Sequence, residues 1–185
     1  PLCRAKRPTS DEETIKYLRP WVKKKKAWAL NGMGQMYLNG AGVKQSYKKA
    51  RALFKQAAQQ GYVCAMYNLG IMYHYGDAGV EQSYEMARML YEQAAEQGDV
   101  SAMLDLGFMY EHGKGVEQSY EKAFEYYEQA ADLGDATAQY GLGHLYATGQ
   151  GVTKDFLKAK EWWKASAAHG NEKAAKNLQK YSRRK

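Results

Sequence analysis

The chain has 185 residues, 45% of them hydrophobic and 13% aromatic, with a formal net charge of +7 at pH 7. This composition is typical of a folded protein and excludes a disordered one. No apolar run approaches the roughly 18 residues that a transmembrane helix needs, so no membrane-spanning segment is predicted. Two cysteines, Cys3 and Cys64, are too few for a disulfide scaffold and favour an intracellular location, in the simplest case the cytoplasm. Because the chain begins with Pro1 rather than Met, the presence of a targeting segment upstream is left open.

The first predicted helix lies at residues 10–26. Ser10 and Glu13 have the spacing of a capping box, in which a side chain at each position satisfies a free backbone N–H group. Pro20 lies inside this segment and lacks a backbone donor. The helix is therefore predicted to kink or to end near Arg19.

From residue 27 onward the sequence repeats itself every 36 or 37 residues. A Gly-Val pair recurs once in each repeat, beginning at Gly42, Gly79, Gly115 and Gly151. Each unit shows helical apolar spacing, then a glycine-rich loop, then a second amphipathic helix. The second helices are predicted to begin at residues whose side chains can cap them: Ser46, Ser83, Ser119 and Asp155. One such helical pair cannot bury its own apolar face, but stacked pairs can, which predicts an all-α repeat fold.

This register divides the chain into seven segments. They are an N-terminal extension (1–9), a single helix equivalent to half a repeat (10–26), four repeats (27–61, 62–98, 99–134 and 135–170), and a capping helix with a basic tail (171–185).

The repeat resembles a known family. The pattern A-x-x-x-L-G-x-x-Y-x-x-G-x-G-V, followed by S-Y-E-K-A-x-x-Y-Y-E-Q-A-A-x-x-G-D, is similar to the Sel-1-like repeat, a relative of the tetratricopeptide repeat. Residues 102–135 carry almost the whole pattern, and the resemblance extends over about residues 10–177. It implies an α/α right-handed superhelical solenoid of helix–turn–helix repeats, used as a scaffold or adaptor in protein complexes. Some bacterial members hold a disulfide in each repeat, and the cysteines for it are absent here.

The search for catalytic or metal-binding motifs finds little. None of the four histidines lies at i, i+4 from another His or Cys, so no local metal site is predicted. No nucleophile and base pair is recognisable either, and we expect neither enzymatic activity nor a cofactor. Cys64 occupies a position that Ser101 and Thr137 fill in later repeats. It is expected to be a small, half-buried side chain rather than a nucleophile.

The first four residues, P-L-C-R, lie outside the repeat. They resemble the end of a RING-type zinc finger, in which two cysteines at C-x-x-C spacing share a zinc ion. Cys3 is a zinc ligand only if such a finger lies upstream, and otherwise an ordinary exposed cysteine. The finger would make the chain the substrate-recognition part of a RING-type E3 ubiquitin ligase, which is the alternative function.

Charge is distributed unevenly along the chain. Residues 1–60 carry a net charge of +11, residues 61–134 carry −10, and residues 135–185 carry +6. A nucleic-acid-binding protein favours a continuous basic surface, so nucleic acid is not the favoured partner. The pattern predicts an acidic surface for a basic peptide, or weak self-association between basic ends and the acidic middle. A third interpretation is that the pattern has no functional meaning.

If the geometry of tetratricopeptide repeats applies, the first helices present residues outside the core to a concave groove. The predicted partner-binding residues are Asn68, Ile71, His74, Tyr75, Asp105, Phe108, Glu111, His112, Tyr140 and His144. Tyr140 fits a core position equally well. Aromatic and polar side chains mixed along a groove suit peptide capture. The sequence thus predicts a non-enzymatic scaffold that binds a protein or peptide on its concave face.

Overall fold

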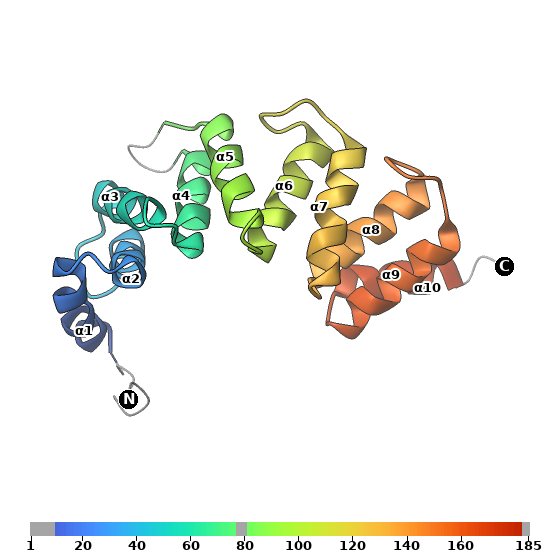
Figure 1. Ribbon diagram of the computed structural model, residues 1–185. Coiled ribbons are helices and arrows are strands. Elements are labelled where there is room, and N and C mark those ends of the chain that lie inside the picture. The colour runs from blue at the N-terminus through green and yellow to red at the C-terminus, as the bar shows by residue number, and fades with distance from the viewer. Residues whose placement is uncertain (1–9, 77–80, 183–185) are drawn as a thin grey trace. The chain divides into compact units, whose positions relative to one another are not determined.

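The computed structural model describes residues 10–76 and 81–182. Within these two ranges the chain forms ten α-helices and no strand (Figure 1). Their bounds are α1 Asp11–Lys23, α2 Ala27–Asn39, α3 Tyr47–Ala58, α4 Val63–Tyr75, α5 Tyr84–Ala95, α6 Val100–His112, α7 Tyr120–Asp132, α8 Ala136–Thr148, α9 Phe156–Ala168 and α10 Glu172–Ser182. The predicted all-α architecture of repeated helical hairpins is confirmed.

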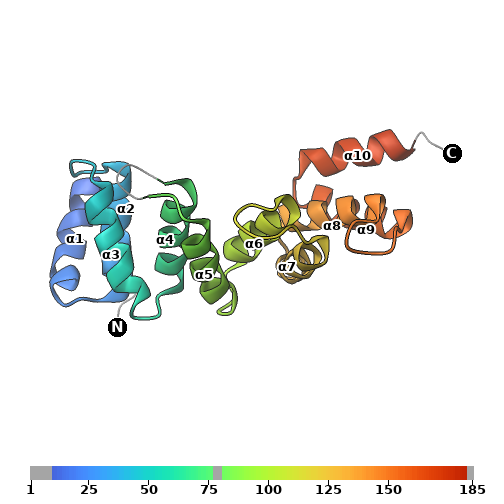
Figure 2. The ribbon, with the colours of Figure 1, turned by 90° about the horizontal axis from the view of Figure 1, so that it is seen from above.

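The helices belong to two compact units, which divide between residues 94 and 95. In the first unit α2 packs against both α1 and α3, and α3 packs against α4. In the second unit each helix from α6 to α9 packs against the next, and α10 lies beside α9 (Figure 2). Neighbours in sequence are thus neighbours in space within each unit, as repeated hairpins require.

The predicted caps of the second helices are present. The side chains of Ser46, Ser83 and Ser119 each accept a hydrogen bond from the backbone N–H group three residues later. Asp155 accepts two such bonds, from the backbone of the residues two and three positions on. Ser10 caps α1 in the same way, with its Oγ 3.2 Å from the Glu13 nitrogen. These local bonds satisfy donors that the first turn of a helix leaves free, so they define where each helix begins.

The core of each hairpin depends on one glycine that faces one ring. A glycine of the first helix contacts a buried aromatic side chain of the second, in the pairs Gly34 with Phe54, Gly70 with Tyr91, Gly107 with Tyr127 and Gly143 with Trp163. All four rings are at most 4% exposed. An added Cβ at any of these glycines would overlap the ring. The repeated glycine is therefore required for packing rather than for a turn.

Pro20 does not end the first helix. α1 continues through it to Lys23, and the Lys24 nitrogen still bonds to the Pro20 carbonyl at 3.3 Å. Of the two predicted outcomes, an end of the helix near Arg19 is wrong, and a kink there stays a prediction. Proline removes one backbone donor, but Ile15 and Leu18 are buried against α2 and hold the helix in place.

The turn after α1 has an unusual residue. Lys25 has φ of +52°, the only positive φ of a non-glycine residue in the described ranges. Its nitrogen bonds to the Val22 carbonyl, and the Lys26 nitrogen bonds to the Trp21 carbonyl. This is the Schellman arrangement that later repeats build with a glycine, for example Gly134.

We expect Lys25→Gly to stabilise the protein by about 1 kcal/mol, because glycine adopts the left-handed conformation without the steric cost of a side chain. Lys24→Gly is the matched control, since Lys24 has φ of −83° and gains no such relief. Urea denaturation of both variants followed by circular dichroism measures the difference. A midpoint that falls equally in both would contradict the prediction.

Candidate binding groove

A groove with a volume of about 430 Å³ opens on the surface of the second unit. Six residues predicted from the sequence line it: Asp105, Phe108, Glu111 and His112 on α6, and Tyr140 and His144 on α8. Tyr127 of α7 and Lys173 of α10 also contribute. Four helices of the same unit therefore meet around one hollow.

Helical spacing brings these side chains to the groove. Asp105, Phe108 and His112 follow one another at intervals of three and four residues, so they share one face of α6. Tyr140 and His144 are four residues apart on α8. Tyr140 is half-buried and also packs against the core around Trp163, so both of its predicted positions hold in part.

A carboxylate in the lining of the groove is held by a buried tyrosine. The hydroxyl of Tyr127 donates a hydrogen bond of 2.6 Å to Oε2 of Glu111. Tyr127 is only 4% exposed. Burial is the main reason why the pKa of its hydroxyl is raised above the ordinary value of 10.0, and the hydrogen bond and negative charge of Glu111 add to it. The tyrosine therefore stays neutral and holds the carboxylate in one position.

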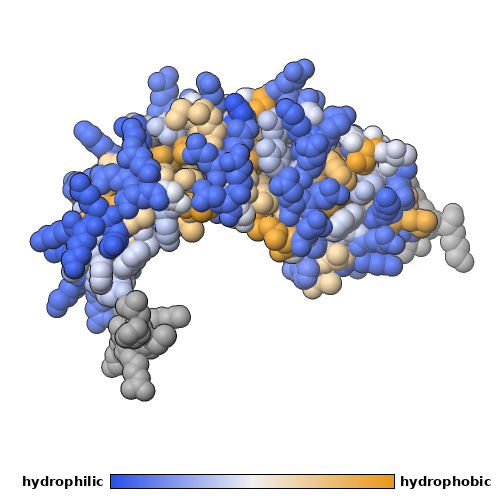
Figure 3. All heavy atoms as spheres, in the orientation of Figure 1, coloured by the Kyte–Doolittle hydropathy of each residue, from blue (hydrophilic) through white to orange (hydrophobic). Residues whose placement is uncertain are grey.

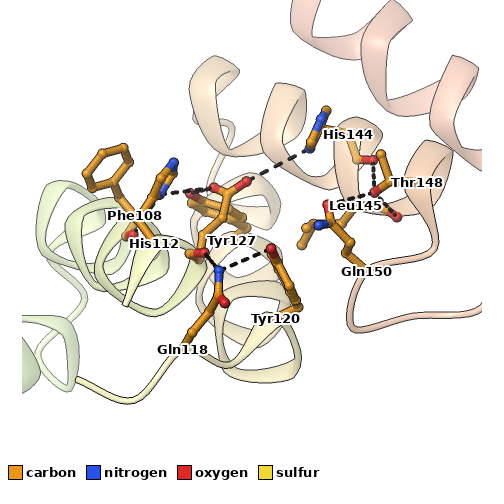
Figure 4. A network of polar contacts seen from close by, with 10 residues as sticks. Phe108, His112, Gln118, Tyr120, Tyr127, His144, Leu145, Thr148 and Gln150 are labelled. Atoms are coloured by element: carbon orange, nitrogen blue, oxygen red, sulfur yellow. Dashed lines mark hydrogen bonds and ion pairs between the residues drawn. The ribbon is translucent and has the colours of Figure 1, made fainter. Parts of the chain in front are cut away.

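Two histidines flank the same carboxylate (Figure 4). Nδ1 of His112 lies 3.9 Å from Oε2 of Glu111, and Nδ1 of His144 lies 3.9 Å from Oε1. Nδ1 of His112 is also 3.0 Å from the carbonyl oxygen of Phe108, so it must carry a proton to make that bond. The Phe108 and His112 rings stack with their centroids 4.1 Å apart. The groove thus combines an aromatic stack with an acidic centre.

The lining of the groove offers aromatic and charged contacts to a ligand. The exposed face of Phe108, with 45% of the residue accessible, can attract a cationic group, and Asp105 and Glu111 provide negative charge close to it. No cluster of three or more His, Cys, Asp or Glu suited to a metal ion occurs among the residues that the structure describes. Lys173 brings one positive charge to the lining. The lining therefore combines an exposed aromatic ring, two carboxylates and one ammonium group.

The other four predicted residues lie on α4 in the first unit. Asn68 donates a hydrogen bond of 3.0 Å to Asn31, a buried residue of α2, and so ties two successive first helices together. His74 contacts the rings of Tyr75 and Tyr84, with centroids 4.8 and 5.2 Å away. Tyr75 is 69% exposed, and Ile71 is half-buried. Their role in binding stays a prediction.

The sequence did not reveal that Tyr127 belongs to the groove. Its position in the repeat is a core position, and the residue is indeed buried. Comparison of the repeats could have indicated it, because the third repeat has Glu111 where the other repeats have Leu38, His74 and Ala147. The third repeat alone therefore combines a tyrosine hydroxyl with a carboxylate.

The structure tests the prediction for only one of the two cysteines. Cys3 lies outside the described residues. Cys64 is exposed, so the expectation of a half-buried side chain is wrong. It lies at the start of α4, where Ser101 and Thr137 occupy the same exposed position in later repeats. The first turn of these helices faces solvent at that position.

Comparison with known proteins identifies the family. The sequence profile of the Sel1 repeat matches four segments, at residues 29–62, 65–99, 100–135 and 136–171. The chain belongs to the Sel1 repeat family. Members of this family are helical-repeat scaffolds, generally without enzymatic activity and generally involved in protein–protein interaction.

Solved structures of Sel1 repeat proteins are similar over most of the chain. A Sel1 repeat protein from Oxalobacter formigenes is 34% identical with a TM-score of 0.86, over 91% of this chain and 69% of its own. A protective antigen with an SLR fold, present in uropathogenic Escherichia coli strains, is 33% identical with the same TM-score over 89% of this chain. This chain spans only 35% of that antigen's length. An immunity protein from Pseudomonas aeruginosa, 22% identical with a TM-score of 0.59 over 94% of this chain and 64% of its own, shares the fold.

No curated protein matches the chain closely enough to extend this comparison. Among the described residues, none of the helices is both long and apolar enough to cross a bilayer.

Proposed function

We propose that this Sel1 repeat chain is a non-enzymatic scaffold that binds a basic segment of another protein in the groove of its second unit. The observation that carries the proposal is the convergence of six first-helix side chains on one hollow of about 430 Å³. Two of them, Phe108 and His112, are exposed side chains whose rings stack on each other. An exposed aromatic residue in the lining of a concave site, here Phe108, is typical of protein-binding surfaces.

The chemistry of the groove supports a basic partner. Asp105 and Glu111 lie in the part of the sequence, residues 61–134, that carries a net charge of −10. A guanidinium group could lie against the Phe108 ring and bond to a carboxylate with its parallel N–H groups. Glu111 is already held by Tyr127, so little side-chain entropy is lost when it binds.

The experiment is an affinity purification from the source cells with three versions of the chain. Phe108→Ala combined with His144→Ala removes two accessible side chains of the groove without touching the buried Tyr127 bond. Leu157→Ala is the matched control, because Leu157 is a 74% exposed apolar residue of α9 in the same unit that does not line the groove. We expect the double variant to lose its main partner, with affinity reduced by about tenfold or more.

The partner recovered by the unchanged chain should carry a basic segment, and a synthetic peptide of that segment should bind with the same dependence on Phe108. Equal recovery of every partner by the double variant and the control would contradict the proposal. A main partner whose binding segment is acidic would contradict the assignment of a basic ligand.

Two further predictions remain outside this proposal. The role in a RING-type ubiquitin ligase depends on Cys3 and on a finger upstream of it, and ubiquitin transfer measured with the natural protein would test it. Weak self-association between basic ends and acidic middle is tested by sedimentation at increasing salt, where it should disappear.

A further inference from the structure

A second groove lies in the first unit, between α1, α2 and α3. It has a volume of about 410 Å³. Its floor is apolar and is formed largely by Ile15, Met33 and Leu53. Three cationic side chains, Arg19, Lys23 and Lys49, line it as well, and no acidic residue does. All three are exposed, and hydrophilic side chains cover most of the visible surface over α1–α3 (Figure 3).

Two side chains that line this groove, Ile15 on α1 and Leu53 on α3, are smaller than their counterparts in the second unit. In the repeat register, Phe124 of α7 corresponds to Ile15, and Trp162 of α9 corresponds to Leu53. In the second unit the Phe124 ring packs edge-on against Tyr146, with centroids 5.6 Å apart. The hollow beside Tyr146 and Trp162 is lined by α8 and α9 alone, without any residue of α7. In the second unit larger rings thus occupy the two positions, and the hollow of about 430 Å³ that remains there lies on α8 and α9 only, whereas the groove of the first unit reaches α1.

Two charges of the groove are also reversed relative to the third repeat. Arg19 and Lys23 stand where the third repeat has Glu128 and Asp132. Nζ of Lys49 lies 5.0 Å from the centre of the Tyr37 ring, and this contact holds a third positive charge at the groove. The contact of Lys49 with Tyr37 recurs in the second unit as Lys158 with Tyr146. The sizes of Ile15 and Leu53 and the charges of Arg19 and Lys23 are what differ from the second unit at this register.

We propose that this groove binds an acidic amphipathic helix of a partner protein. One or two apolar side chains of that helix would enter the hollow, and its carboxylates would pair with Arg19, Lys23 and Lys49. A hydrophobic hollow between helices is the geometry in which amphipathic helices dock, and carboxylates form bidentate bonds to arginine. This inference goes beyond the proposed function, because it concerns a different unit and a ligand of opposite charge.

Charge disfavours the chain's own N-terminal residues as the occupant. Residues 1–9 contain Arg4, Lys6 and Arg7 and no acidic residue, so they have the same sign as the groove. A partner with negative charge complements it.

The test begins with a displayed library of helical peptides. Apolar residues occupy one face of each peptide, and all remaining positions are Glu, Lys or Gln with equal frequency. The full chain is the target, and each selected peptide is tested again on Arg19→Glu combined with Lys23→Glu. We expect the peptides that depend on Arg19 and Lys23 to be rich in Glu and poor in Lys. The proposal is overturned if no peptide depends on them, or if the dependent peptides are not acidic.

The strongest dependent peptide is then titrated against matched variants by fluorescence anisotropy. Arg19→Glu with Lys23→Glu should weaken binding by about tenfold or more. Lys16→Glu with Lys48→Glu is the control, because it makes the same charge change at exposed positions of α1 and α3 that do not line the groove. We expect it to change affinity less than about threefold. Equal losses of affinity in the two double variants would mean that the attraction is non-specific, and would overturn the proposal.

Leu53→Trp provides an independent check. It places in the groove the residue that the fourth repeat has at this register, without a change in charge. Binding should fall about tenfold because the hollow is filled, while circular dichroism shows a folded chain. Self-association of the unliganded chain that Arg19→Glu with Lys23→Glu abolishes would make a second copy the occupant, and would also overturn the proposal.

Discussion

Gly34→Ala is expected to destabilise the protein by about 2 kcal/mol, although a Gly-to-Ala change at an exposed position of a helix is ordinarily stabilising. Alanine gains about 1 kcal/mol over glycine from helix propensity. At Gly34, however, the added Cβ would lie 2.6 Å from Cε1 and 2.8 Å from Cδ1 of Phe54. Phe54 is fully buried and its ring is rigid, so relief requires α2 and α3 to move apart. Overpacking of this kind costs up to about 3 kcal/mol, which outweighs the gain.

The measurement is urea denaturation of the variant beside two controls. Gly32→Ala lies on the same helix, but its Cβ would meet the flexible end of Leu18 at 3.3 Å, so its cost should be small. Phe54→Leu in the Gly34→Ala background should recover part of the loss, because the shorter side chain leaves room for the methyl group. Equal stability of Gly34→Ala and Gly32→Ala would show that the ring does not limit the distance between the helices.

The second large effect is expected at alkaline pH. In the unfolded chain Tyr127 ionises near its ordinary pKa of 10.0, whereas in the folded chain burial and Glu111 raise that pKa. The folded state therefore retains a proton that the unfolded state releases. This contribution to stability is constant below about pH 10 and is lost as pH rises further, at about 1.4 kcal/mol for each pH unit. Between pH 9 and 11.5 the loss from this one residue should be about 2 kcal/mol.

Tyr127→Phe isolates this contribution. At pH 7 the variant should be less stable by about 1 kcal/mol, since Glu111 loses a hydrogen bond. Its stability should fall by about 2 kcal/mol less than that of the unchanged chain between pH 9 and 11.5. Other tyrosines and lysines titrate in both proteins, so the difference removes them. Denaturation curves at several pH values give the result, with the exposed Tyr75→Phe as a control. Parallel loss in the unchanged chain and in Tyr127→Phe would mean that Tyr127 does not retain its proton.

Local signals in the sequence predicted the helices well, because their causes are local. Ser46, Ser83, Ser119 and Asp155 cap helices through hydrogen bonds to residues two or three positions away. Of the two effects predicted for Pro20, the end of the helix was wrong for a related reason. Its local effect opposes a helix, but the burial of Ile15 and Leu18 against α2 is a tertiary effect and prevails.

Six of the ten predicted first-helix residues line the groove of the second unit, and the other four lie on α4 in the first unit. Asp105, Phe108 and His112 lie on one face because helical geometry alone brings residues three and four apart together. What they bind depends on a partner, and no pattern within one chain specifies it.

The sequence by itself determined the repeated helical hairpins, since caps, glycines and apolar spacing act within a few residues. Only the tertiary structure decided the chemistry of the two grooves. The bond from Tyr127 to Glu111 joins residues 16 positions apart, and the hollow at Ile15 and Leu53 depends on residues 38 positions apart. Such features come from differences between repeats rather than from the repeat. Their effect appears only when packing brings the differing side chains into contact.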